Sequence, residues 1–93
     1  MIYVYLDMNI TSPETFDQYK EIAADAMGKH GCSVLSIGKD NFTLDGRQNA
    51  PNIAVILSFP DKASALASIN EPELTHIHDL RRKAGFNSMT LIG

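Results

Sequence analysis

One charged side chain in this sequence is placed by the helical period on an apolar helix face. Arg81 belongs to a predicted helix that follows Pro72 and ends at Ala84, and it falls within about 45° of the centre of the inner face. That face is set by Leu74, Ile77, Leu80 and Ala84. A guanidinium turned toward the interior is costly unless it is paired, so Arg81 is a candidate to bind an anionic ligand. An ion pair with a carboxylate such as Asp7, or a side chain that extends back to water, remains an alternative.

His30 is a second candidate, because it lies near the end of a predicted helix over residues 13–30 and within its apolar stripe. The helix dipole favours a protonated imidazole at this end, so the ring could act as a general acid or base at a ligand site. A histidine that only hydrogen-bonds the last carbonyls of the helix is the alternative.

Tyr5 and Asp7 are the remaining candidates for a ligand site. With Tyr3 they share one face of a predicted strand over residues 2–9, opposite the apolar face. The phenols could orient a ligand, and the carboxylate could take a proton. Packing at an interface explains the tyrosines equally well, because aromatic residues with one polar end are common at protein contacts.

Other chemical motifs are weak or missing in the sequence. Gly28 and Gly31 lack the following Lys-Ser/Thr of a phosphate-binding loop. His76 and His78 are two residues apart, which on a helix places them on opposite sides, whereas zinc needs ligands that converge. We therefore expect no metal site and no cofactor. Cys32 is the only cysteine, so no intrachain disulfide can form. Its side chain could be a reactive thiol or a small buried apolar group.

The composition of the chain limits which kinds of partner it could bind. The chain has 93 residues, 44% of them hydrophobic, and a net charge of −3, which fits one ordinary globular domain. Its one basic cluster, Arg81 to Lys83, is too short to follow a nucleic-acid backbone, so we expect no nucleic-acid partner. The longest apolar run, Ile53 to Leu57, is far below the ~20 residues of a membrane span. With no signal-peptide pattern at Met1, we expect a cytoplasmic protein away from membranes.

The hydrophobic pattern predicts four strands and three helices. Thr11 and Glu14 suggest a capping box that starts the first helix, and Gly31 is placed to end it in the left-handed conformation. Asp61 is placed to cap the second helix, and Gly85 to stop the third. Strands are predicted over residues 2–9, 33–38 with a short extension at 42–44, 53–59 and 86–92, and a loop runs from Arg47 to Pro51.

This order corresponds to the split β-α-β arrangement, a ferredoxin-like β-α-β-β-α-β sandwich of the α+β class. The expected protomer has a four-stranded antiparallel sheet, with strands 2–9 and 53–59 in the centre and helices on one face. The second face is then left open and carries an apolar patch of Tyr3, Tyr5, Ala54, Ile56 and Ile92. Because such a patch is unusual on a monomer, we expect a homodimer that packs through this face.

Several short segments together resemble the bacterial domain-of-unknown-function family 1330, and the resemblance covers nearly the whole chain. They are Leu44-Asp45-Gly46 followed by Pro51, then Ser58-Phe59-Pro60, Glu71-Pro72-Glu73, Arg81 and the terminal Ile92-Gly93. The sequence departs from the family pattern at Cys32, Asp45, the Glu71–Leu74 run and Ile92. The resemblance implies a dimeric α/β barrel, a superfamily that includes cofactor-free monooxygenases, haem proteins and small cyclases, so the fold does not select a chemistry.

Two functional hypotheses follow from the sequence. The first is a dimer with a small-molecule pocket between sheet and helices that accepts an anionic or carbonyl-bearing ligand. Its enzymatic version would resemble the cofactor-independent oxygenases or isomerases of the superfamily. The second is a purely structural or sensing dimer in which His30 and Arg81 have no ligand.

Overall fold

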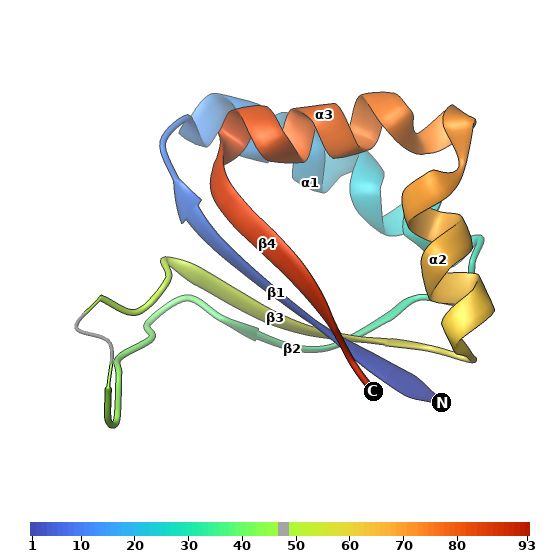
Figure 1. Cartoon of the computed structure of the whole chain (residues 1–93). Coiled ribbons are helices and arrows are strands. Elements are labelled where there is room, and N and C mark those ends of the chain that lie inside the picture. The colour runs from blue at the N-terminus through green and yellow to red at the C-terminus, as the bar shows by residue number, and fades with distance from the viewer. Residues whose placement is uncertain (47–48) are drawn as a thin grey trace.

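Four strands pair into one antiparallel sheet in the computed structural model of the protein, which describes residues 1–46 and 49–93. The strands are β1 (Ile2–Ile10), β2 (Ser33–Gly38), β3 (Ile53–Phe59) and β4 (Gly85–Ile92), in the sheet order β2-β3-β1-β4 (Figure 1). β1 and β3 are therefore the central strands. The predicted α+β, ferredoxin-like fold is confirmed.

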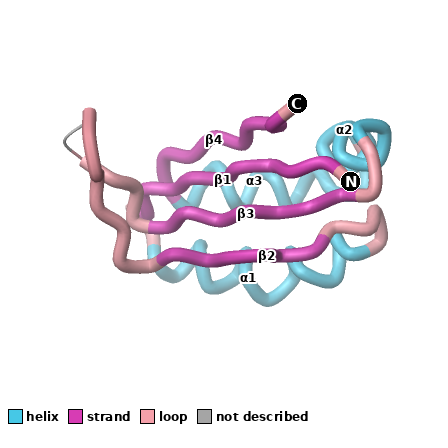
Figure 2. The backbone as a smooth tube through the Cα atoms, turned by 90° about the horizontal axis from the view of Figure 1, so that it is seen from below, coloured by secondary structure: helices cyan, strands magenta, loops and turns pink. Residues whose placement is uncertain are grey.

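The helices lie on one face of this sheet. They are α1 (Pro13–Gly28), α2 (Lys62–Asn70) and α3 (Thr75–Ala84), with a short 3₁₀ turn at Pro72–Leu74 before α3. Figure 2 views the molecule from below, and there the sheet lies in front of the helices with no helix over it. The predicted open face is thus present in the protomer.

The first helix differs from its prediction at both ends. Its N-cap is Ser12 rather than Thr11: the Ser12 Oγ accepts a hydrogen bond from the Thr15 backbone N–H at 3.4 Å and also bonds the Thr15 hydroxyl. The helix ends at Gly28 instead of His30, because the backbone N–H groups of His30 and Gly31 bond the carbonyls three residues back in a tightened last turn. Gly31 does adopt the left-handed conformation, with φ 78°. The Asp61 cap of α2 is confirmed, since its carboxylate accepts from the Ser64 N–H at 2.7 Å.

The passage from α3 to β4 uses no loop. β4 begins at Gly85, one residue before the prediction, and pairs there with Ile10 at the end of β1. A side chain at position 85 would collide with the backbone carbonyl of Asn9, so only glycine permits this approach. The Ala84 carbonyl also accepts hydrogen bonds from the backbone N–H groups of Thr11 and Ser12 at 2.8 and 3.0 Å. The start of α1 is thereby fixed to the end of α3.

A bulge in β2 decides which of its residues face the helices. Val34 pairs with Leu57, but Ser36 pairs with Ile56, so Leu35 is an extra residue in the strand. Val34 and Ile37 are three residues apart and would lie on opposite faces of a regular strand. The bulge puts both on the helix side of the sheet, where they line the same cavity.

The chain between β2 and β3 contains no extension of β2 among its described residues, so the predicted strand at 42–44 is wrong. Phe42 and Leu44 are 78% and 90% exposed and lie in no strand. The Asn41 side chain closes the base of this segment by donating to the carbonyls of Gly38 and Pro51 at 2.9 and 3.1 Å. The predicted loop that starts at Arg47 falls partly outside the described residues.

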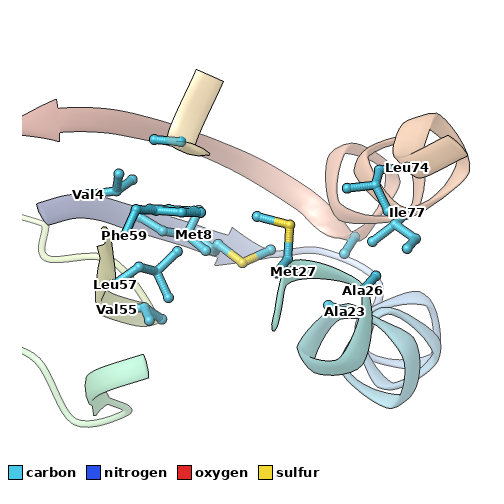
Figure 3. Packing of buried hydrophobic residues seen from close by; sticks show 13 residues of the cluster. Val4, Met8, Ala23, Ala26, Met27, Val55, Leu57, Phe59, Leu74 and Ile77 are labelled. Carbon is cyan, nitrogen blue, oxygen red and sulfur yellow. The ribbon is translucent and has the colours of Figure 1, made fainter. Parts of the chain in front are cut away.

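The core lies between the sheet and the helices and has two parts. Val4, Met8 and Phe59 project from the central strands, and Met27 of α1 points toward Met8 (Figure 3). The second part lies between the helices, where Ala26 of α1 faces Ile77 of α3. The α1 backbone packs closely on α3 but makes few close approaches to any strand. This spacing leaves room between α1 and the sheet.

Candidate functional site

Arg81 is the centre of a buried polar cluster under the helices. Arg81 is 5% exposed, which confirms the predicted inward orientation of its side chain. The Arg81 Nε donates to the Asn87 Oδ1 of β4 at 3.0 Å, and one terminal nitrogen donates to the His78 Nδ1 at 2.6 Å. The Asn87 amide donates in turn to the Arg81 and Gly85 carbonyls at 3.1 and 3.2 Å. The guanidinium is therefore held in one orientation between α3 and β4.

The contacts of His78 fix its tautomer. A guanidinium has only donors, so the Nδ1 that faces Arg81 must be unprotonated. The proton is then on Nε2, which donates to the Ser68 carbonyl of α2 at 2.7 Å. His78 is 2% exposed, and burial lowers the pKa of its imidazole below the ordinary value of 6.5; the Arg81 charge lowers it further, while the Ser68 carbonyl opposes the change. A neutral imidazole is the form that suits this position.

Tyr19 of α1 completes the cluster. Its phenol lies close enough to the buried Arg81 guanidinium for the two groups to interact electrostatically. Burial raises the pKa of the Tyr19 phenol above its ordinary value of 10.0, although the Arg81 charge opposes the rise. Burial lowers the pKa of Arg81, and the Tyr19 oxygen opposes that change. At neutral pH the pair is a neutral phenol beside a charged guanidinium.

A cavity of about 400 Å³ lies between α1 and the sheet, and we refer to it as the α1 cavity. Its wall on the sheet side is apolar and includes Leu6, Met8, Ile53, Val55, Leu57 and Met89. Tyr19 and Cys32 bring polar atoms to the lining, and Lys20 and Lys39 bring charges. Arg81 does not line the cavity, so Tyr19 stands between the guanidinium and this space. The lining suits a small ligand with an apolar body.

Cys32 is half-buried in the wall of this cavity. Burial raises the pKa of its thiol above the ordinary value of 9.0. Since the thiolate is the nucleophilic form, the environment of Cys32 favours an unreactive thiol.

Comparison with known proteins places this fold in a family. The model of the family described as Domain of unknown function (DUF1330) matches residues 1–93. The chain belongs to this family. The predicted resemblance is thereby confirmed. A search of curated proteins found no match.

Solved structures with the same fold share little sequence with this DUF1330 chain. The crystal structure of a protein of unknown function from Rhodopseudomonas palustris has a TM-score of 0.78 at 18% identity and covers 98% of this chain and 78% of that chain. An uncharacterized NIPSNAP domain protein from Burkholderia xenovorans has a TM-score of 0.63 at 11% identity, covering 100% and 93%. An antibiotic biosynthesis monooxygenase has a TM-score of 0.57 at 17% identity, covering 100% and 97%. These likenesses show the fold alone.

The residues predicted for one ligand site lie in three places in this DUF1330 protein. Arg81 is in the buried cluster. His30 is half-buried and lines a separate hollow between α1 and the start of α3, next to Glu21, Glu71 and Glu73. Tyr5 and Asp7 lie on the open face of the sheet, where Asp7 accepts a hydrogen bond from the Ser88 Oγ at 2.9 Å. The ion pair between Arg81 and Asp7, considered above, is wrong, because the sheet separates the two side chains.

Three residues of the cluster were not among the sequence candidates. His78 was considered only with His76 as a metal pair, although its spacing of three from Arg81 puts both on one helix face. Tyr19 lies among the apolar residues of the first helix, where its sequence position does not distinguish it from a core residue, and Asn87 carried no signal. Among the described residues, no group of three or more His, Cys, Asp or Glu side chains could hold a metal ion. Nor does the described part of the chain contain a helix of the length and hydropathy needed to cross a membrane.

Proposed function

We propose that this protein is a homodimer that binds one small molecule in the α1 cavity of each protomer. The observation that carries the proposal is the cavity, whose volume of about 400 Å³ lies in the range of roughly 300–1,000 Å³ typical of small-molecule sites. It is formed because α1 packs on α3 and stands away from the strands. An apolar wall with a few polar groups is also the usual composition of such sites.

The charges of the lining favour an anionic or carbonyl-bearing ligand. Among the described lining residues, the charged side chains are Lys20 and Lys39, and both are positive. Lys20 is partly offset by Asp17, at 3.2 Å on the exposed side of α1, and lies 4.9 Å from the centre of the Phe16 ring. The separate hollow near His30 is bordered by glutamates and is less suited to an anion.

A cavity-filling variant and its neighbour test this site. Val34 lines the cavity and is about half-exposed, so in Val34→Trp the larger ring can occupy the cavity without displacing the core. Leu35 is equally exposed but does not line the cavity, so Leu35→Trp is the matched control. In a thermal-shift screen against a metabolite library, compounds that raise the melting temperature of the native protein should lose their effect on Val34→Trp and keep it on Leu35→Trp. A native protein that no compound stabilises, or equal binding by both variants, contradicts the proposal.

The open face of the sheet supports the homodimer. Tyr3 pairs with Ile92 and Tyr5 lies opposite Ile56, so apolar side chains from three strands adjoin on a face that no helix covers. Phe86, at the far end of the same face, is strongly exposed. A second copy of this face would cover these side chains, and monomers seldom leave such a patch in water. Light scattering at micromolar concentration should give twice the protomer mass.

A catalytic version of the proposal is favoured by the polar cluster beside the cavity. A phenol beside a guanidinium can stabilise negative charge that develops on a substrate oxygen, as cofactor-independent oxygenases and isomerases require. Mass spectrometry of each stabilising compound after incubation with the protein distinguishes the roles. A changed compound indicates an enzyme, and an unchanged one indicates a binding or sensing dimer.

We also assign the protein to the cytoplasm as part of this proposal. The support is Cys32, a single half-buried thiol that has no cysteine in the chain to pair with. Fractionation of cells that express the native gene should recover the protein with cytoplasmic markers, and recovery with secreted proteins contradicts the assignment.

A further inference from the structure

Tyr19 occupies a position that joins the two features of the site. Its side chain lines the α1 cavity, and its phenol interacts with the buried Arg81, which lies outside the lining. The apolar wall does little to fix the orientation of a ligand, because the hydrophobic effect is not directional. A polar atom at one end of the cavity is therefore what would fix how a ligand lies in it.

The chemistry of the Tyr19–Arg81 pair determines how the phenol is oriented. The guanidinium carries a positive charge and has no acceptor, so it attracts the Tyr19 oxygen and not the Tyr19 proton. The phenol proton is then directed away from Arg81. Because the positive charge of Arg81 beside this oxygen polarises the phenol, the Tyr19 O–H becomes a stronger donor to a further acceptor.

We propose that the Tyr19 hydroxyl is the anchor of the α1 cavity and donates a hydrogen bond to a carboxylate oxygen of a ligand whose apolar body lies against the sheet. This inference rests on the proposed function and names the class of ligand. The positive charge of Arg81 stands behind the donor and offsets the negative charge of the ligand, while Lys20 and Lys39 add positive charge elsewhere in the lining. Burial raises the pKa of the Tyr19 phenol, so the donor keeps its proton at neutral pH.

His78 and Asn87 act on the ligand only through Arg81. His78 accepts from a terminal nitrogen and Asn87 from Nε, so the guanidinium cannot rotate away from Tyr19 without losing both bonds. We regard both as positioning residues. The carboxylate anchor thus draws on two helices and one strand, although Tyr19 alone meets the ligand.

The test compares carboxylates with uncharged ligands of the same shape. Benzoate, cinnamate and hexanoate are the probes, and benzamide, cinnamamide and hexanamide are their neutral partners, with binding measured by titration in NMR spectra. The native protein should bind the acids about tenfold more tightly than the amides. Tyr19→Phe should remove most of this preference, with a loss of about tenfold or more for the acids and a smaller loss for the amides, whose carbonyl is the weaker acceptor. Leu35→Trp, which changes a residue outside the lining, should behave as the native protein.

The outcomes separate this inference from the proposed function. If Val34→Trp abolishes acid binding and Tyr19→Phe does not change the preference, the cavity binds ligands but Tyr19 is not its anchor. If Val34→Trp leaves acid binding unchanged, the cavity is not the site and the proposed function fails as well. Equal binding of acids and amides by the native protein, or no binding of either at millimolar concentration, overturns the carboxylate anchor without the use of any variant.

Discussion

The two faces of the sheet carry alternating residues of the same strands but hold their polar groups in different ways. On the helix side the polar side chains are enclosed, and Arg81 and His78 find partners from three elements. On the open face, Asp7 and Ser88 meet each other across neighbouring strands at the surface. An enclosed group that loses its partner cannot turn to water, whereas a surface group can. The same chemical change should therefore cost much more on the helix side.

The largest effect is expected for His78→Leu. It removes the acceptor of a buried guanidinium and also the donor to the Ser68 carbonyl. The free energy of unfolding should fall by about 3 kcal/mol, because a buried charge and a buried carbonyl both lose a partner. Urea denaturation measures the change.

His76→Leu is the matched control for this prediction, because His76 is exposed two residues away on the same helix. Its cost should stay within about 0.5 kcal/mol. Equal losses for the two variants would show that the cluster contributes nothing beyond helix stability.

A second, smaller effect is expected on the open face for Ile56→Asp. A carboxylate in the centre of this face would lie between the two sheets of the proposed dimer, so it should weaken association at least about a hundredfold. The protomer itself should lose only about 1 kcal/mol, because position 56 is half-exposed in it. Light scattering over a concentration series measures the dissociation.

Leu66→Asp serves as the control for the open face. Leu66 is an exposed apolar residue of α2, which belongs to the helix layer and not to the sheet. It should leave the mass unchanged, and dissociation by both variants alike would point to a contact elsewhere.

The sequence predicted the elements well because local rules decide them. Alternation of apolar residues defined β1, Pro60 and Asp61 separated β3 from α2, and the period of α3 turned Arg81 inward. The errors arose where two local signals competed. Thr11 and Ser12 can both cap a helix. The backbone N–H groups of both residues bond the Ala84 carbonyl, and these bonds set where the chain turns into α1. The helix then begins at Pro13, so Ser12 is the cap.

The candidate site was harder to predict because its partners come from distant parts of the chain. The helical period of α3 shows that Arg81 points inward but not what it meets there. Tyr19 and Asn87 reach it only after α1 packs on α3 and β4 returns beside β1. Alternation along β1 did place Tyr5 and Asp7 on the open face, and that alone was sufficient to separate them from Arg81.

The smallest expected effect is a pH dependence that belongs to His78 alone. Burial lowers the pKa of His78 in the folded protein below its ordinary value of 6.5. As the pH falls below about 6.5, the unfolded chain takes up a proton at this position and the folded chain does not, so the unfolded state gains stability. The contribution of His78 is therefore complete above about pH 6.5 and is lost as the pH falls, with a slope of at most about 1.4 kcal/mol per pH unit.

His78→Gln isolates this contribution from that of the other titrating groups. Glutamine has a carbonyl that can accept from Arg81 and an amide that can donate to Ser68, but it does not titrate. Urea midpoints of the native protein and the variant, measured side by side from pH 7.5 to 5, should converge as the pH falls, because only the native protein loses stability through position 78. Burial disfavours the charged ring, and the charge on Arg81 adds to this effect, because a protonated His78 would present a second cation to it and give up the lone pair that Arg81 bonds. Curves that stay parallel over this range would mean that His78 takes up its proton as readily in the folded protein as in the unfolded chain, and the enclosure of the cluster would then be wrong.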